Sequence, residues 1–160
     1  LLVFRGENIF LSLAGISNPK QHHSFGHTHS DKLGISLQVG EEDILVNPGT
    51  YLYTPIPSRR IEFRTVKSHN TVSVNGEEQN TPLSGSMGLF NVKNETRFNL
   101  VCATDNSVVA EITYRDIIHR RKVQIKDHQV VIQDWCNKEF IQNWNNGNPY
   151  SNGYGKRVAT

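Results

Sequence analysis

The feature that most constrains the fold is a two-residue alternation of apolar and polar side chains that runs through much of the chain. Leu33, Ile35, Leu37 and Val39 alternate with small or polar residues. On an extended backbone these four side chains would lie on one face. No window longer than a few residues shows the 3.6-residue period of an amphipathic helix. The chain is therefore expected to fold as strands, each with one buried face.

Turn signals separate the apolar runs at short intervals. Gly6-Glu7-Asn8 and Asn75-Gly76 lie between such runs and predict hairpin turns. Pro48 ends a strand ladder and Gly49 permits a turn with positive φ. Many short strands joined in this way predict an all-β fold, an antiparallel β-sandwich or barrel. The expected strands are 1–5, 9–14, 33–39, 44–46, 71–74, 89–92, 98–103, 108–115, 118–126 and 129–135.

Two stretches depart from this pattern. Residues 51–64 contain two prolines and are expected to form a long irregular loop. Residues 143–160 are rich in Asn and Gly and are expected to be loop or disordered. The alternative for this tail is a loop whose aromatic side chains contact sugars. The predicted domain organisation is a β-sandwich domain over residues 1–142 followed by the tail.

Composition excludes several partners. The 160 residues include 17 Lys and Arg against 15 Asp and Glu, a formal net charge of +2, and the charges are scattered. Neither nucleic acid nor a membrane surface is indicated. No run approaches the roughly 20 apolar residues of a membrane span. Because the chain starts at Leu1 without a signal-peptide pattern, we interpret it as part of a longer protein.

A few residues are assigned from their context alone. Phe98 and Trp135 are expected in the core, and His119 is expected in solvent. Cys102 and Cys136 lie in apolar strands, where either two thiols or a disulfide would suit.

The stretch Gly26-His27-Thr28-His29-Ser30-Asp31 carries the strongest functional signal. Its two imidazoles would point to the same face of an extended segment, and the carboxylate of Asp31 could orient one ring. Asn47 ends a later strand and His69-Asn70 precede another, so all these groups lie at strand ends. Two imidazoles and one oxygen ligand with an open position would suit zinc.

The order and spacing of these motifs resemble the heparinase II/III-like family. The resemblance covers roughly residues 26 to 80, and His119-Arg120-Arg121 fits more loosely. It is carried by the histidine motif, by Ile44-Leu45-Val46-Asn47-Pro48-Gly49-Thr50-Tyr51, by Phe63-Arg64-Thr65, and by Ser68-His69-Asn70-Thr71-Val72-Ser73-Val74-Asn75-Gly76-Glu77.

The resemblance implies a supersandwich-like β-sandwich that belongs to a larger polysaccharide lyase with an N-terminal α/α-toroid. Such enzymes cleave uronic-acid-containing glycans by β-elimination. The base and its helper lie on the toroid, so the isolated fragment is expected to be inactive. An acidic polysaccharide is the expected substrate. By the same analogy, a periplasmic or extracellular location in a bacterium is expected.

The resemblance also implies roles for individual residues. His27 matches the catalytic position near the substrate carboxylate. His29 and His69 match ligands of a structural divalent metal. Asp31 would orient one of the two imidazole rings without binding the metal itself. Asn47 stands where the family usually has Asp, so Zn²⁺ would be held less strongly and Ca²⁺ is an alternative.

Four more residues are candidates for contact with the substrate. Tyr51, Tyr53 and Asn70 lie in or beside the motifs, and Arg64 could pair with a carboxylate in bidentate fashion. For each, ordinary packing or surface charge is the alternative.

Two other functions remain open. One is a non-catalytic carbohydrate-binding or structural β-sandwich. The other is a cupin-like metalloenzyme, which fits less well because no Glu follows His29 closely and no His follows Pro48-Gly49.

Overall fold

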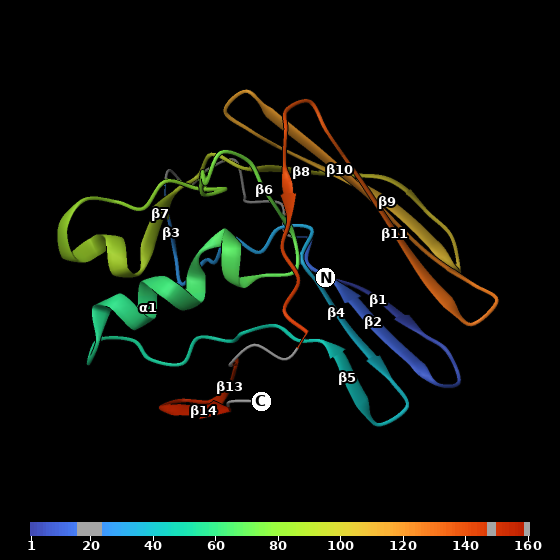
Figure 1. Cartoon of the computed structure of the whole chain (residues 1–160). Helices are drawn as coiled ribbons and strands as arrows, with labels where there is room; N and C mark the ends of the chain where they lie inside the picture. The colour runs from blue at the N-terminus through green and yellow to red at the C-terminus, as the bar shows by residue number, and fades with distance from the viewer. Residues whose placement is uncertain (16–23, 147–149, 159–160) are drawn as a thin grey trace.

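The computed structural model describes residues 1–15, 24–146 and 150–158. Two four-stranded antiparallel sheets form a sandwich, which confirms the predicted all-β fold class (Figure 1). The first sheet has the order β1-β2-β4-β5, with β1 Leu2–Arg5, β2 Ile9–Leu13, β4 Ile35–Val39 and β5 Glu42–Leu45. The second has the order β11-β10-β9-β8, with β8 Arg97–Ala103, β9 Ser107–Tyr114, β10 Ile117–Lys126 and β11 Gln129–Cys136.

The core lies between the inner faces of these sheets. The alternation in Ile35–Val39 places Ile35 and Leu37 inward, and β9 alternates in the same way from Val108 to Tyr114. Burial of these apolar side chains is the main favourable term in folding. The core cluster consists of Leu11, Leu13, Leu33, Ile35, Leu37, Val74, Val108, Ala110, Ile112, Tyr114, Ile117 and Val123.

Shorter elements lie at one end of the sandwich (Figure 1). Three two-stranded pairs join segments that are mostly distant in sequence. They are β3 Ser24–Gly26 with β7 Asn91–Lys93, β6 Val72–Ser73 with β12 Ile141–Gln142, and β13 Tyr150–Gly153 with β14 Lys156–Val158. The 3₁₀ helices are η1 Val66–Ser68 and η2 Gly85–Leu89. No helix in the described part of the chain is long and apolar enough to cross a membrane.

The turn at Gly6-Glu7-Asn8 joins the paired strands β1 and β2 as a hairpin, whereas the turn at Asn75-Gly76 closes on a single antiparallel bridge between Val74 and Glu77. Asn75 and Gly76 both have positive φ, and the amide of Glu77 donates to the carbonyl of Val74 at 2.9 Å. Such a pair of positive φ angles suits the twist of an antiparallel hairpin, which is why Asn-Gly is favoured there. Gly49 also has the expected positive φ, of +71°.

The prediction of an irregular loop over residues 51–64 is wrong for its second half, because residues Pro57–Arg64 form the helix α1. Pro57 occupies the first helical turn, where a missing N–H costs nothing. The buried residues of α1 are Arg60, Phe63 and Arg64, at the spacing of one helical face. Because two of these three are arginines, the helical period does not appear in a pattern of apolar residues.

The tail prediction also differs from the structure. Residues 150–158 form the hairpin β13–β14 instead of an irregular loop, while residues 147–149 and 159–160 lie outside the described residues. The amide of Ser151 donates to the carbonyl of Pro48 at 2.9 Å, so the hairpin is held by the segment after β5. Backbone pairing of this kind is independent of side-chain type, which explains why composition did not reveal it.

Two assignments from context are wrong. Trp135 is 53% exposed, on the outer face of β11, whereas Phe98 packs against the core as predicted. His119 is fully buried, and its Nε2 donates to the carboxylate of Asp134 at 2.7 Å. The parity of β10 places His119 on the inner face, where a polar ring requires a partner. Cys102 and Cys136 are both free thiols.

A buried ion pair joins the neighbouring strands β10 and β11 of the second sheet. The Nε and Nη2 atoms of Arg121 donate to the two carboxylate oxygens of Asp134 at 2.7 and 2.8 Å. Its Nη1 donates to the backbone carbonyls of Leu33 and Asn70, each at 2.6 Å. Arg121 therefore ties β10 and β11 to the segment that carries His69 and Asn70.

Candidate functional site

The structure brings the two motif histidines at positions 29 and 69 together. His29 follows β3, and His69 comes directly after η1, three positions before β6 begins at Val72. Their ring centroids are 5.3 Å apart, with an interplanar angle of 57°. Residues 40 positions apart in sequence thus form one imidazole pair, as the position of both motifs at strand ends predicted.

Both imidazoles are held neutral by their surroundings. Burial lowers the pKa of His69 to about 4. Burial also lowers the pKa of His29 to about 3, with further contributions from His69 and from Arg60. A charged imidazole is disfavoured in a desolvated site beside other positive groups. At neutral pH each ring therefore offers a lone pair.

Arg60, which sequence reasoning missed, occupies one of these lone pairs. Its Nη1 lies 2.8 Å from Nε2 of His29, and because a guanidinium only donates, the imidazole nitrogen accepts. Arg60 is 0% exposed, and burial lowers its pKa. Its guanidinium lies over the ring of Tyr53, 5.5 Å from the centroid. The sequence signal that could have indicated its burial is its spacing of three residues from Phe63, which places both side chains on one face of a helix.

The side chains, as they lie, do not present three free ligand atoms for a metal. Nε2 of His69 is buried and has no hydrogen-bond partner among the described residues, which would suit a ligand. Nε2 of His29 accepts from Arg60, however, and Oδ1 of Asn47 accepts from the amide of Gly49 at 2.9 Å. Within the described ranges, no group of three or more His, Cys, Asp or Glu could hold a metal ion. Binding of a metal by this set would require Arg60 to leave Nε2 of His29, and the zinc or calcium site stays a prediction.

Asn47 and His69 nevertheless line the same cavity, of about 290 Å³, together with Asp31. His29 is not among the residues that line it. The predicted third ligand therefore borders the same cavity as His69.

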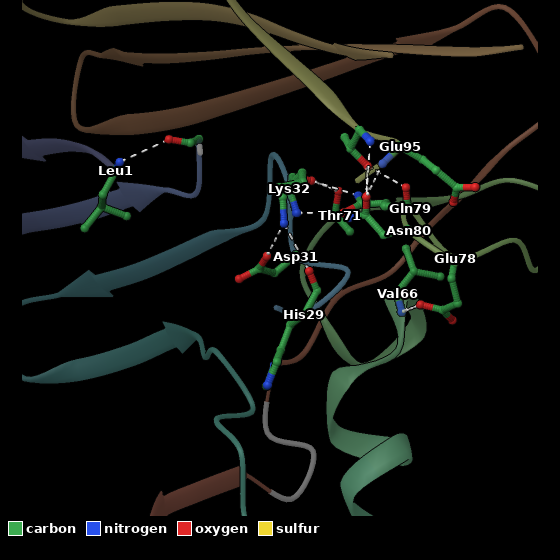
Figure 2. Close-up of polar contacts among 12 residues, drawn as sticks. Leu1, His29, Asp31, Lys32, Val66, Thr71, Glu78, Gln79, Asn80 and Glu95 are labelled. Atoms are coloured by element: carbon green, nitrogen blue, oxygen red, sulfur yellow. Dashed lines mark hydrogen bonds and ion pairs between the residues drawn. The ribbon is translucent and has the colours of Figure 1, made fainter. Parts of the chain in front are cut away.

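Asp31 does not take the role predicted for it. Its carboxylate lies 3.5 Å from the ammonium of the buried Lys32, and the ring of His29 points away from it (Figure 2). Lys32 is fixed from several sides, because its amide donates to Oε1 of Gln79 and its carbonyl accepts from Oγ1 of Thr71. Asp31 neutralises Lys32 and acts on the two imidazoles only through its charge.

Two of the predicted substrate contacts lie in the interior. Asn70 is buried, and its Nδ2 donates to the carbonyls of Ile35 and Val46 while its Oδ1 accepts from the amide of Asn145. Arg64 is also buried, and its Nη1 donates to the carbonyl of Gly88 at 2.5 Å. Both side chains hold the fold in this structure, and neither presents its polar atoms at the surface.

The predicted contacts that do reach the surface are aromatic. His27 is exposed and meets Tyr53 edge-on, with ring centroids 5.4 Å apart. Phe90 contacts His27 at 5.5 Å and Tyr53 at 6.1 Å. Tyr154 stacks on Tyr53 at 5.7 Å with an interplanar angle of 25°. We call His27, Tyr53, Phe90 and Tyr154 the aromatic cluster.

Of the aromatic cluster, sequence reasoning missed Phe90 and weighed Tyr154 only through the alternative interpretation of the tail. Tyr51, also predicted, packs on Phe63 with ring centroids 5.1 Å apart. Tyr51 is half-buried and has a positive φ of 61°. Its ring therefore supports α1, while Tyr53 supplies the exposed surface.

Comparison with known proteins gives a consistent family and fold. The sequence profile of the family described as heparinase II/III-like, C-terminal, matches residues 2–139. A crystal structure of heparinase III aligns with a TM-score of 0.62 at 19% identity, over 79% of this chain and 19% of that chain. A second heparinase III gene product aligns with a TM-score of 0.58 at 18% identity, over 91% of this chain and 23% of that one.

Heparan sulfate lyase HepC from Pedobacter heparinus aligns with a TM-score of 0.54 at 15% identity, over 80% of this chain and 19% of that one. These likenesses show a shared fold. The chain spans only about a fifth of the length of the solved structures that it matches. No curated protein matches the sequence.

Proposed function

The chain belongs to the heparinase II/III-like C-terminal family, and from this membership we propose that it is the β-sandwich domain of a polysaccharide lyase. The proposed substrate is a uronic-acid-containing glycan, cleaved by β-elimination in the periplasm or outside a bacterial cell. The intact protein is proposed to carry an N-terminal helical toroid, which the greater length of the solved relatives supports.

The chemistry of β-elimination explains which groups this domain must supply. The proton on C5 of a uronate is weakly acidic while the neighbouring carboxylate keeps its charge. Hydrogen-bond donors or cations around that carboxylate stabilise the enolate-like intermediate. A base then removes the proton, and an acid protonates the departing O4. We assign the base to the toroid and the stabilisation of the carboxylate, in part, to this domain.

His27 is the residue of this chain that we assign to the substrate carboxylate. Its exposed position in the aromatic cluster is the single observation that carries the assignment. The amide of His27 donates to the carbonyl of Phe90 at 2.8 Å, so the backbone that presents the ring is fixed. A side chain that is already positioned before the reaction needs little rearrangement when negative charge develops on the substrate.

Two buried arginines contribute positive charge behind this surface, Arg60 directly beneath the ring of Tyr53. Arg60 and Arg64 both lie on the inner face of α1, and Arg60 forms no ion pair with a carboxylate in the described part of the chain. A positive potential in a low-dielectric region attracts an anionic chain more strongly than the same charge in open solvent. The field therefore suits an acidic glycan, although Arg60 itself is covered.

The test is cleavage of a panel of uronate glycans by the intact protein, followed through the ultraviolet absorbance of the unsaturated product. His27→Ala should lower kcat/KM by at least about a hundredfold, the usual loss when a group that stabilises developing charge is removed. The matched control is His128→Ala, an exposed histidine in the turn after β10. Retained activity in His27→Ala, or cleavage by the 160-residue fragment alone, would contradict the assignment.

A non-catalytic carbohydrate-binding module is the second candidate. The exposed rings of Tyr53 and Tyr154 favour it, because stacking on a sugar requires no base. Binding of uronate glycans by the intact protein without any unsaturated product would select this function over the lyase.

A further inference from the structure

The tail hairpin β13–β14 places an aromatic side chain beside the surface assigned to the substrate. It lies outside the residues that the family profile matches, which end at position 139. The amide of Gly155 donates to the carbonyl of Tyr51 at 2.8 Å, and the amide of Ser151 donates to the carbonyl of Pro48 at 2.9 Å. The hairpin is thus bonded at two points to the segment that leads from β5 to α1.

A close backbone approach at Gly49 makes this docking specific. A Cβ at position 49 would lie 2.6 Å from the carbonyl oxygen of Ser151, far inside contact distance. Gly49 also has a φ of +71°, which L-residues rarely adopt. The absence of a side chain at position 49 therefore allows the hairpin to lie against the loop that carries Tyr53.

Tyr154 lies in the turn between β13 and β14, and its ring stacks on Tyr53. Tyr154 is 60% exposed and Tyr53 is 38% exposed, so the pair leaves considerable aromatic surface to solvent. Tyr53 in turn contacts His27. The three rings form a continuous row that runs from the family-matched region onto the tail.

We propose that Tyr154 is a substrate-binding residue, which extends the glycan-binding surface one sugar ring beyond the region matched by the family profile. This inference rests on the proposed function. An exposed aromatic ring offers a flat apolar face for a sugar ring and loses little conformational entropy when it binds. Tyr154 is held in place before binding by the hairpin and by Tyr53, so its contact area is available at low cost.

The charge of the tail fits an acidic glycan. Residues 143–160 contain Lys156 and Arg157 and no Asp or Glu. Both cationic side chains are exposed, directly after the turn that carries Tyr154. An acidic sugar stacked on Tyr154 would therefore meet positive charge on the adjacent strand, and binding should weaken as salt is added.

Because Tyr154 lies outside the groups assigned to proton transfer, it should act on binding and leave the chemical step unchanged. In the intact protein, Tyr154→Ala should raise KM for the cleaved glycan about two- to tenfold, the range for loss of one aromatic contact. kcat should stay within about twofold, since uniform binding affects KM alone. Tyr154→Phe, which keeps the ring, should match the wild type.

The measurements separate this inference from the proposed function. If the wild type cleaves a uronate glycan and Tyr154→Ala has the same KM, Tyr154 only packs the tail and the inference is overturned. If the wild type neither cleaves nor binds any uronate glycan, the proposed function fails and the inference fails with it. A KM that rises equally in Tyr154→Phe would overturn binding through the aromatic ring, because the hydroxyl would then be the binding group.

Discussion

Replacing Asp134 by Asn should destabilise the protein strongly, because it leaves a buried guanidinium without its counter-charge. The side chains of Asp134 and Arg121 are both 0% exposed, and their bidentate contact has N···O distances of 2.7 and 2.8 Å. Breaking a buried pair in this way costs about 3–5 kcal/mol. The amide oxygen of Asn can still accept one hydrogen bond, so the lower end, about 3 kcal/mol, is expected.

The assay is denaturant unfolding of wild type and Asp134→Asn, supported by calorimetry. A loss of about 3 kcal/mol should lower Tm by roughly 6–12 °C in a chain of this size. The control is Asp116→Asn, which removes an exposed ion pair with Lys138 and should have no resolvable effect. If the two variants unfold alike, the buried pair between β10 and β11 does not stabilise the fold as argued.

The pH dependence of the same variant gives an independent check. Burial alone would raise the pKa of Asp134, but hydrogen bonds from His119 and Arg121 outweigh it and hold the pKa below its usual range. A depressed folded pKa gives stability that is present above the unfolded value, about 3.9, and is lost as pH falls through the folded value. The difference in free energy of unfolding between wild type and Asp134→Asn should therefore shrink below about pH 4. A difference that is constant from neutral pH to pH 2 would refute the electrostatic account.

Two further predictions concern the site. Gly49→Ala should displace the tail hairpin and speed hydrogen exchange at the amides of Ser151 and Gly155. The control is Gly40→Ala, because Gly40 has a similar positive φ but open space around it, and its exchange at these amides should not change. Equal exchange in both variants would show that the contact at Gly49 does not hold the hairpin. Arg60→Ala in an Asn47→Asp background should raise Zn²⁺ affinity by at least about tenfold in calorimetric titration, because it frees Nε2 of His29 and removes a repelling cation. The control is Arg59→Ala, because Arg59 is the exposed neighbour of Arg60. If the wild type binds Zn²⁺ tightly and Arg60→Ala leaves the affinity unchanged, Arg60 does not block Nε2 of His29 as a ligand.

Period-two patterning and turn chemistry predicted most of the sandwich, because both are local. Strand β9 alternates buried and half-buried residues throughout, and the turn at Asn75-Gly76 has the geometry that its residue types favour. The motif residues His29 and His69 were expected to meet because both lie at strand ends, and their rings are adjacent. For these features the sequence contains the physical cause directly.

The predictions that were wrong share a different cause. Whether a polar side chain is buried depends on hydrogen-bond partners that are distant in sequence. His119 and Arg121 are buried because Asp134, on the neighbouring strand, supplies their hydrogen bonds. The face of α1 is buried although it carries Arg60 and Arg64. A hydropathy pattern assigns such residues to solvent, since the carbonyls and rings that receive them are remote in sequence.

Asn70 links both the second sheet and the tail to the imidazole pair of His29 and His69. Its carbonyl accepts from Arg121 of the second sheet, and its Oδ1 accepts from the amide of Asn145, where the tail begins. Since His69 is the preceding residue, loss of Asp134 should disturb the histidine pair through Arg121. Tyr154 is held instead by backbone bonds to Pro48 and Tyr51, which do not pass through Asn70. Asn70 is nevertheless bonded to Val46 and to Asn145 at the start of the tail, so any coupling between Asp134→Asn and Tyr154→Ala should pass through these contacts, and a double-mutant cycle on glycan binding measures it.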